Sequence, residues 1–414
     1  MSSASIIRDS SLAPSGADKI AWVWNNMPLL RAVCADFEKD RPLAGLKVAL
    51  SVHLEAKTAC LCRTLAAGGA EVFATGSNPL STQDDVAAEL ARLGVHVYAT
   101  HGCSQEEYDL YIRKVIEPGP DIIVDDGGDI VQMIRTRFPE LEKNIIGGCE
   151  ETTTGIARLR KLERNGALHF PMIAVNDADC KHLFDNRYGT GQSVFDGIDR
   201  TTNLIVAGKK VVVAGYGWCG KGVSMRAKGL GARVIVTEVD PVKALEAHMD
   251  GFTVMSMDEA AEQGDLFITV TGNCKVITEE HFLKMKNGAI LCNAGHFDVE
   301  VDTACLNRIA AEQKQMKPNI RGYLLPNGTW IYLLAEGRLV NLAAGDGHPA
   351  EIMDMSFAIQ ALSCSYLAGH RGMLEPRLIP VPREIDNAVA SKKLETLGIR
   401  IDALTSEQRE YIGL

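Results

Sequence analysis

The stretch 211-VVVAGYGWCGKG-222 decides the fold of the second half of the chain. An apolar run of strand type ends there at a G-x-G-x-x-G pattern formed by Gly215, Gly217 and Gly220. The first glycine allows a tight turn, the second lets the backbone approach a pyrophosphate, and the third lets a helix pack closely on the strand. Glu238, which ends the next apolar run, is placed to accept hydrogen bonds from the ribose hydroxyls of NAD. The stretch therefore predicts a Rossmann unit that binds NAD in preference to NADP.

Short apolar runs alternate with helical patterns on both sides of this unit. The alternation predicts βαβ units and parallel sheets that are covered by helices on both faces. The pattern pauses near Asn186, where residues 191–208 are typical of one long connecting helix, and it turns helical again after Asn341. We predict an α/β fold with two doubly wound parallel-sheet domains, the second inserted into the first. The predicted parts are a substrate-binding domain (residues 1–185 and 347–380), a Rossmann NAD-binding domain (186–346) and a C-terminal helical tail (381–414).

Composition and charge exclude several classes of protein. The 414 residues carry a formal net charge of −10 with a pI near 5.6, which argues against a nucleic-acid partner because phosphate binding needs a basic surface. The chain lacks an apolar run of membrane-spanning length and an apolar signal segment, so we expect no membrane contact. Its 11 cysteines form neither a CxxC pair nor a zinc-type cluster, which predicts no metal site and a reducing, cytoplasmic location.

Polar residues follow several predicted strands of the first domain. Ligands of open parallel sheets bind beyond the carboxyl ends of the strands, so these residues mark a candidate site. They are His53, Asp125, Asp126, Glu150, Glu151, Asn176 and Asp177. We interpret Asp125, Glu150 and Asp177 as helix caps, a common use of such residues. Lys181 and Asp185 are four positions apart and so share a helical face. They form either a surface ion pair or a part of the site.

Seven motifs, taken together, resemble one family. In chain order they are SNPLSTQDD, DDGGD, EETTTG, KHLFDNRYG, GYGWCGKG, CNAGHFDVE and NLAAGDGHP. Their order and spacing resemble adenosylhomocysteinase (S-adenosyl-L-homocysteine hydrolase), from about residue 20 to residue 414. The resemblance implies a homotetrameric enzyme of the methyl cycle, in one-carbon metabolism, with tightly bound NAD. It also implies reversible cleavage of an S-nucleosidyl-homocysteine thioether by 3′-oxidation, elimination of homocysteine, water addition and reduction.

The resemblance also implies a role for each matching residue. Lys181 and Asp185 would handle the 3′-hydroxyl proton, and burial would suit this role by lowering the lysine pKa. His53 and His296 would be acid and base for the leaving sulfur and the attacking water, and Asp126 would be a base or an orienting group near C4′. Further expected contacts are Glu151 and His348 for the substrate, and Thr152, Thr153, Thr154, Asn186 and Asn341 for NAD.

The chain departs from the family at 53-HLEAK-57, where the commoner pattern is His-x-Thr-x-Glu or His-x-Thr-x-Gln. Adenine presents an acceptor at N1 and an amino donor, whereas hypoxanthine presents an N1–H donor and the acceptor O6. An ionised glutamate only accepts and a lysine only donates, so Glu55 and Lys57 match hypoxanthine. The motif predicts an S-inosyl-L-homocysteine hydrolase. S-adenosyl-L-homocysteine is the alternative substrate if Glu55 and Lys57 pair with each other or bind adenine through water.

Two further departures and two rival functions bear on this prediction. Thr190 stands where many members have cysteine. The sequence ends at EYIGL, whereas many members continue to a Lys- and Tyr-containing tail that reaches NAD in the neighbouring subunit. A dimer is therefore an alternative to the tetramer. An ordinary NAD dehydrogenase would not need the EETTTG and HFDVE motifs. A non-catalytic NAD-binding regulator would be expected to lack Lys181, Asp185 or His53, and all three are present.

Overall fold

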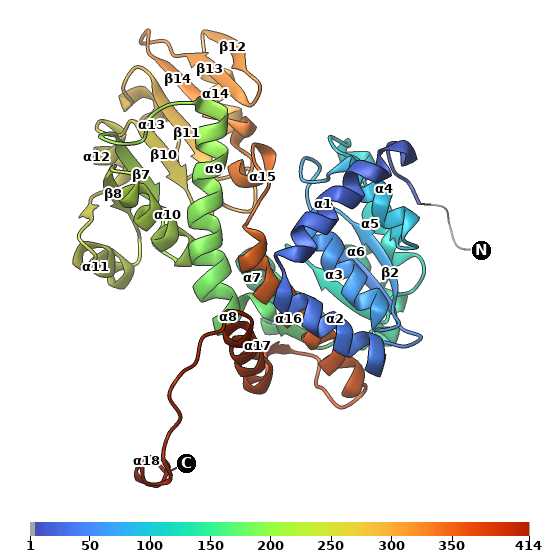
Figure 1. The fold of residues 1–414 in the computed structure, drawn as a ribbon. Helices are drawn as coiled ribbons and strands as arrows, with labels where there is room; N and C mark the ends of the chain where they lie inside the picture. The colour runs from blue at the N-terminus through green and yellow to red at the C-terminus, as the bar shows by residue number, and fades with distance from the viewer. Residues whose placement is uncertain (1–4, 414) are drawn as a thin grey trace.

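The first of two sheets is built from both ends of the chain. The structure, a computed structural model, describes residues 5–413. In this part of the chain seven strands follow the order β15-β6-β5-β4-β1-β2-β3, and all of them pair in parallel (Figure 1). They are β1 (Lys47–Ser51), β2 (Glu71–Thr75), β3 (His96–Val97), β4 (Ile122–Asp125), β5 (Gly147–Glu150), β6 (Met172–Ala174) and β15 (Leu378–Pro380). Because β15 follows the whole second sheet in sequence, the second sheet is an insertion into the first, as predicted.

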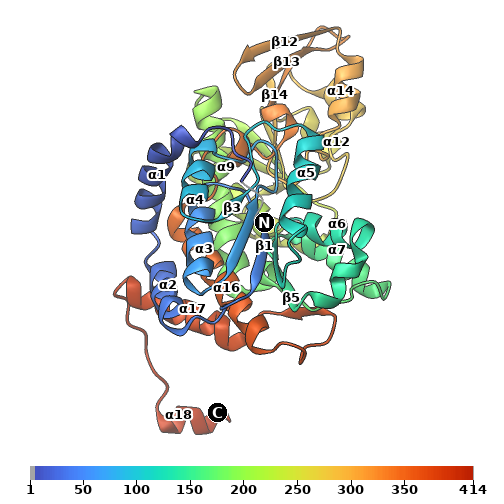
Figure 2. The same ribbon diagram turned by 90° about the vertical axis from the view of Figure 1, so that its right-hand side faces the viewer.

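Helices cover both faces of the first sheet (Figure 2). Val48 and Leu50 of β1 point into one apolar layer and Ala49 points into the other, as the alternation of side chains along a strand requires. The first layer is formed with α1 (Ala13–Asn25), α2 (Pro28–Asp40), α3 (Ala56–Ala67), α4 (Asp84–Arg92), α16 (Ala350–Gly369) and α17 (Arg383–Thr396). The second is formed with α5 (Gln105–Ile116), α6 (Asp129–Arg137) and α7 (Thr153–Arg164).

The second sheet is parallel at its centre and antiparallel at one edge. Its order is β12-β13-β14-β11-β10-β7-β8-β9. The parallel strands are β7 (Lys210–Ala214), β8 (Arg233–Thr237), β9 (Thr253–Val254), β10 (Leu266–Thr269), β11 (Ala289–Asn293) and β14 (Trp330–Leu334). The antiparallel strands are β12 (Glu312–Lys317) and β13 (Ile320–Leu324). The prediction of a parallel sheet missed this hairpin because every residue of β12 is exposed. The polar sequence of β12 therefore lacks the apolar pattern by which a strand is recognised.

Helices also cover both faces of the second sheet. One layer contains α9 (Thr190–Thr202), α10 (Trp218–Gly229), α11 (Pro241–Met249) and α15 (Val340–Ala343). The other contains α12 (Met257–Ala261), α13 (Glu279–Lys284) and α14 (Thr303–Ile309). Short 3-10 turns lie at Ser10–Leu12, Pro139–Asn144, Val175–Asp177 and Ala335–Gly337, and α18 (Ser406–Tyr411) lies apart from the rest of the molecule (Figure 1). Among the described residues, no helix has the length and hydrophobicity needed to cross a bilayer.

A continuous helical run connects the two sheets. It consists of α8 (Asp179–Lys181), a π-helical segment (His182–Gly189) and α9. The run ends at Thr202, earlier than the predicted 208, because Asn203 adopts left-handed backbone angles with φ 54° and so stops the helix. Wide π-turns of this kind are frequent at functional sites.

Two glycines let this run approach α10 closely. A Cβ on Gly222 would lie 1.7 Å from the carbonyl oxygen of Arg187, and a Cβ on Gly191 would lie 2.6 Å from the carbonyl oxygen of Gly222. Both distances are far below van der Waals contact, and the opposing atoms are backbone. Only a residue without a side chain fits at either place.

We expect Gly222→Ala to lower the free energy of unfolding by about 1–3 kcal/mol, because the added methyl group overpacks a rigid backbone contact. Gly229→Ala is the matched control: it lies in the same helix, and its Cβ would meet no atom within 4 Å. The control should be neutral or slightly stabilising, since alanine favours the helix. Thermal unfolding of both variants measures this, and equal midpoints would contradict it.

Candidate active site

A single large cavity collects the predicted residues. It has a volume of about 1090 Å³ and is lined by residues that follow strands of both sheets. Every predicted site residue except Gly220 lines it: His53, Glu55, Lys57, Asp126, Glu151, Thr152, Thr153, Thr154, Lys181, Asp185, Asn186, Gly215, Gly217, Glu238, His296, Asn341 and His348. Gly220 lies behind the wall, where a Cβ would come within 2.0 Å of the carbonyl oxygen of Gly215. This is the close helix–strand packing that its place in the pattern predicts.

The part of the cavity beside the second sheet has the form of a dinucleotide site. Gly215 adopts φ +103°, which only glycine takes readily, and a Cβ on Gly217 would meet open space. Glu238 is held against this turn, since its Oε2 accepts from the backbone N–H of Tyr216 over 2.7 Å and its Oε1 accepts from that of Val239 over 2.7 Å. A carboxylate has about four lone-pair positions, so Glu238 keeps capacity for ribose hydroxyls.

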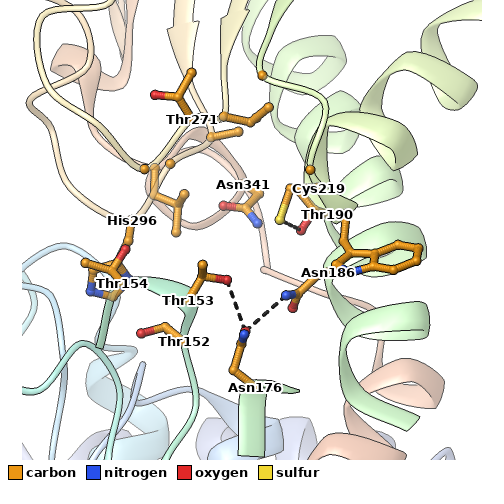
Figure 3. A pocket seen from close by; sticks show the side chains of 18 of the residues that line it. Thr152, Thr153, Thr154, Asn176, Asn186, Thr190, Cys219, Thr271, His296 and Asn341 are labelled. Carbon is orange, nitrogen blue, oxygen red and sulfur yellow. Dashed lines mark hydrogen bonds between the residues drawn. The ribbon is translucent and has the colours of Figure 1, made fainter. Parts of the chain in front are cut away.

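A chain of hydrogen-bonded side chains runs from the first sheet's end of the cavity to the connecting helical run. Oδ1 of Asn176 accepts from Thr153 Oγ1 over 3.3 Å and from Asn186 Nδ2 over 3.0 Å (Figure 3). Oδ1 of Asn186 accepts from Lys181 Nζ over 2.8 Å. The donors and acceptors of this chain are therefore mutually fixed, and they orient the predicted cofactor contacts Thr153 and Asn186 relative to Lys181.

Lys181 lies in a buried cluster of opposite charges. Its Nζ is 3.1 Å from Asp185 Oδ2 and 3.4 Å from Glu151 Oε1, and all three residues are at most 5% exposed. Burial acts to lower the pKa of Lys181, but the carboxylates of Asp185 and Glu151 outweigh it and raise the pKa. The expected lowering is therefore wrong. Burial acts to raise the pKa of Asp185, and Lys181 and His348 outweigh it, so the pKa is lowered. The pair is thus buried as ammonium and carboxylate.

Helix α16 supplies two partners that sequence reasoning missed. Ser356 donates to Asp185 Oδ2 over 2.8 Å, and Gln360 Nε2 donates to Glu151 Oε2 over 2.5 Å. The two residues are four apart and so share one helical face. Their signal is two polar residues at helical spacing on a buried face, both at 0% exposure. His348 reaches the same cluster, since its Nδ1 contacts Asp185 Oδ1.

Asp126 joins histidines from both sheets. His53 Nε2 lies 3.3 Å from Asp126 Oδ2, and His296 Nδ1 lies 3.7 Å from Asp126 Oδ1. His53 and Asp126 follow the paired strands β1 and β4, whereas His296 follows β11 of the second sheet. Burial lowers the pKa of His53 to about 4 against the opposing charge of Asp126. Burial acts to raise the pKa of Asp126, but the histidines outweigh it and lower the pKa.

Ser77 completes this cluster, and sequence reasoning missed it. Its hydroxyl donates to Asp126 Oδ2 over 2.8 Å and lies 3.1 Å from His53 Nδ1. A hydroxyl has one hydrogen, so Nδ1 of His53 is the donor in the second contact and Nε2 of the neutral ring carries a lone pair. Ser77 follows β2 as His53 follows β1, so the rule of polar residues beyond strand ends would have found it.

Glu55 and Lys57 are brought together by the start of α3. Glu55 Oε2 accepts from the backbone N–H of Lys57 over 2.9 Å and caps the helix. The same Oε2 lies 2.8 Å from Lys57 Nζ. Lys57 Nζ also donates to the backbone carbonyl of Asp346 over 2.8 Å. Both side chains are buried, at 5% and 6% exposure, and both line the cavity.

The remaining strand-end carboxyls make local contacts. Asp125 Oδ2 accepts from the backbone N–H of Val131 in the first turn of α6, and Glu150 Oε1 accepts from that of Thr152 at the start of α7. Asp177 Oδ2 accepts from Arg160 over 2.6 Å, which is an ion pair and not a cap. Burial raises the pKa of Asp125 to about 8 and also raises that of Glu150. Neither residue lines the cavity.

Thr190, the departure at the cavity's centre, contacts a thiol from another motif. Its hydroxyl lies 3.6 Å from Cys219 Sγ, in the glycine-rich turn, and 3.3 Å from His348 Nε2 (Figure 3). A cysteine is therefore present beside this position although it is absent at residue 190.

Sequence models of one family match both halves of this arrangement. The model described as "S-adenosyl-L-homocysteine hydrolase" matches residues 4–138, and that described as "S-adenosyl-L-homocysteine hydrolase, NAD binding domain" matches residues 186–347. The chain belongs to the S-adenosyl-L-homocysteine hydrolase family. It is therefore an NAD-dependent hydrolase of the adenosylhomocysteinase type, and NAD is its cofactor. The open space at Gly217 and the fixed carboxylate of Glu238 fit that cofactor.

Relatives of this hydrolase carry two different names. "Adenosylhomocysteinase" of Thermococcus kodakarensis is 58% identical over 98% of this chain and 96% of its own length. "S-inosyl-L-homocysteine hydrolase" of Methanopyrus kandleri is 57% identical over the same shares, and that of Methanocaldococcus jannaschii is 56% identical over 98% of each chain. Since both names occur at nearly equal identity, overall similarity does not select the purine base.

We expect the pH dependence of unfolding of the ligand-free protein to show that Glu151 binds a proton more tightly in the folded state. Burial raises the pKa of Glu151 from 4.5 to about 7 although Lys181 opposes it. Folding therefore favours the protonated form, and the contribution of Glu151 to the free energy of unfolding falls as pH rises from 4.5 to about 7. Glu151→Gln keeps a neutral group at every pH. The free energy of unfolding of this variant should therefore rise relative to that of the wild type between pH 5 and about 7.5, by up to a few kcal/mol. The unfolding midpoints of the two proteins measure this difference.

The control for this comparison is Glu140→Gln, because Glu140 is exposed. Its midpoint should follow that of the wild type across the same pH range. A difference between Glu151→Gln and the wild type that stays constant or shrinks as pH rises would contradict the raised pKa.

Proposed function

We propose that this protein is an S-inosyl-L-homocysteine hydrolase, which cleaves its substrate reversibly to inosine and L-homocysteine. The observation that carries the choice of base is the buried Glu55–Lys57 pair on the cavity wall. S-adenosyl-L-homocysteine, giving adenosine, is the alternative substrate. A cytoplasmic homotetramer in the methyl cycle is part of the same proposal, and the family resemblance alone supports it.

The three N–H donors of Lys57 can all be accounted for. One faces Glu55 Oε2 and one is donated to the carbonyl of Asp346, which leaves one for a ligand. The O6 of hypoxanthine accepts such a donor, whereas the amino group of adenine does not. Both contacts of Glu55 described above are made by Oε2, so Oε1 is the oxygen assigned to N1–H of hypoxanthine. The internal pairing of the two side chains is therefore compatible with reading the base.

Adenine in the same place would leave mismatched groups. Glu55 would face the N1 lone pair and Lys57 would face an amino donor. Each buried polar group left without a partner costs about 1–3 kcal/mol, and more when it is charged. Sites built on one hydrogen-bond pattern reject the opposite pattern by up to roughly 10⁴–10⁵-fold.

The Lys181 cluster would handle the 3′-hydroxyl group. NAD, held at Gly215, Gly217 and Glu238, would supply the hydride acceptor for C3′ and the hydride for the final reduction. Lys181, held as an ammonium by Asp185 and Glu151, would donate to the 3′-oxygen and stabilise the negative charge that develops there. As the hydride leaves C3′, the hydroxyl proton would pass through Lys181 to one of these two carboxylates. Glu151 would accept from a ribose hydroxyl. Ser356 would hold Asp185 in place without contacting the substrate.

The His53–Asp126–His296 cluster would move the remaining protons. The 3′-ketone acidifies the C4′ hydrogen, and a base beside it then allows homocysteine to leave by elimination. Nε2 of His53 carries a lone pair, so it is placed to take a proton and pass it to the leaving sulfur. His296 comes from the other sheet, so the cluster is complete only while the two sheets enclose the substrate, which also excludes water from the ketone.

The test is a pair of thiol-release assays with S-inosyl- and S-adenosyl-L-homocysteine at equal concentration, with NAD supplied. We expect kcat/KM to favour the inosyl compound by on the order of 10²–10⁴-fold, the sum of two mismatches. Lys57→Gln should reduce this ratio by about 10-fold or more, because a carboxamide both donates and accepts.

Lys39→Gln is the matched control, since Lys39 is exposed at the end of α2 and lies outside the cavity. It should leave the ratio unchanged. Preference for the adenosyl compound would sink the proposed base, and absence of thiol release from both compounds would sink the hydrolase itself.

A further inference from the structure

The helical run that carries Lys181 begins without a cap of its own. It starts at Asp179, and the preceding residue, Ala178, has extended backbone angles but no side chain that could accept a hydrogen bond. The first N–H groups of a helix have no partner inside the helix, so they need an acceptor from elsewhere. Serine, threonine, aspartate or asparagine usually supplies that acceptor from the position that Ala178 occupies.

Asp386 of α17 supplies the acceptor from the other end of the chain. Its Oδ2 accepts from the backbone N–H of Asp179 over 2.7 Å, and its Oδ1 accepts from that of Cys180 over 2.9 Å. Its backbone carbonyl also accepts from the Cys180 thiol over 3.4 Å. A carboxylate is favoured here because the start of a helix carries a partial positive charge, and hydrogen bonds to a charged group are the stronger kind. Asp386 therefore fixes the start of the run.

Helix α17 is itself anchored to the helix that completes the Lys181 cluster. Lys393 lies seven residues after Asp386, about two helical turns, so both face the same side of α17, with buried Val389 between them. Lys393 Nζ lies 2.8 Å from Oδ2 of Asp354, a fully buried carboxylate of α16. Helix α16 also supplies the donors to the two carboxylates around Lys181. One face of α17 thus holds both the start of the run and α16.

The position of Lys181 depends on the start of the run, because Lys181 is its third residue. Its Nζ lies 3.1 Å from Asp185 Oδ2, 3.4 Å from Glu151 Oε1 and 2.8 Å from Asn186 Oδ1. Glu151 follows β5 of the first sheet, so fraying of the first turn would move Lys181 and leave Glu151 in place. Asp386 does not line the cavity, so it reaches the site only through the run.

We propose that Asp386 is a positioning residue of the hydrolase, which holds Lys181 at the 3′-oxygen of the nucleoside from outside the cavity. The proposal rests on the proposed function, in which Lys181 donates to that oxygen. Without the Asp386 carboxylate, oxidation at C3′ should slow, because the 3′-oxygen and the ammonium group would no longer meet in the right geometry. Binding of the nucleoside should change little, since Glu55 and Lys57 contact the base elsewhere in the cavity.

The test mixes the holoenzyme with saturating inosine and, separately, with saturating adenosine, and follows the absorbance of enzyme-bound NADH. This partial reaction reports oxidation at C3′ alone, and the two nucleosides make it independent of the choice of base. We expect Asp386→Asn to lower the first-order rate by about 10–100-fold, since a displacement of about 1 Å can cost about 10²-fold. The half-saturating nucleoside concentration should change by less than about 3-fold, as expected when an interaction of the transition state alone is lost.

Two further variants separate positioning from stability. Ser104→Ala is the matched control, because Ser104 caps α5 on the same sheet and lies outside the cavity. It should lower the unfolding midpoint as Asp386→Asn does, but it should leave the rate of NADH formation unchanged. Ala178→Ser combined with Asp386→Asn gives the run a cap of its own and should recover most of the lost rate.

Equal rates in Asp386→Asn and the wild type, or failure of Ala178→Ser to recover the rate, would overturn the proposal. If Asp386→Asn alone does not fold, the double variant decides: oxidation near the wild-type rate supports the proposal, and slow oxidation overturns it. If the wild type forms NADH with neither nucleoside, the proposed function falls and the role of Asp386 falls with it. Equal rates, by contrast, remove the role of Asp386 alone.

Discussion

The structure depends on the mutual neutralisation of charges that it buries. Lys181 and Asp185 are almost fully enclosed, and each would be costly to bury without the other. Glu151 lies beside them, and there burial outweighs the attraction of Lys181. Removal of one partner would leave an unpaired charge, so the cluster constrains everything around it. Ser356 and Gln360 on α16 are there to satisfy the carboxylates. The first sheet therefore needs α16, which the chain reaches only after it has completed the second sheet.

This order of the chain explains why the two sheets form one site. Strand ends of the first sheet bring the proposed substrate contacts, strand ends of the second bring the dinucleotide turn, and His296 of the second lies beside Asp126 of the first. The glycine contact between α10 and the connecting helix keeps the backbones close enough for one cavity to span both. A shallow surface groove would not protect a 3′-ketone from water, whereas a cavity between two sheets can.

Local patterns predicted much of this, and long-range contacts were the part they missed. Gly215, Gly217 and Glu238 belong to one strand–turn–helix unit, so their spacing along the chain carries their geometry. Gln360 acts through a partner far away in the sequence, and spacing does not identify such a pair, whereas Ser77 follows a strand end and could have been found by that rule. The hairpin β12–β13 was missed because its exposed strand has no apolar period. Predicted site residues met in one cavity because parallel strands end at one edge, which is a rule of topology.

We propose that one enclosed site oxidises a purine nucleoside and moves its C4′ proton, and that the purine it prefers is hypoxanthine. The most direct test is to incubate the holoenzyme in D₂O with inosine and, separately, with adenosine, and to follow deuterium at C4′ by NMR. We expect inosine to acquire deuterium at C4′ much faster than adenosine does. Faster labelling of adenosine would contradict the assignment of the base, and labelling of neither nucleoside would contradict the chemistry.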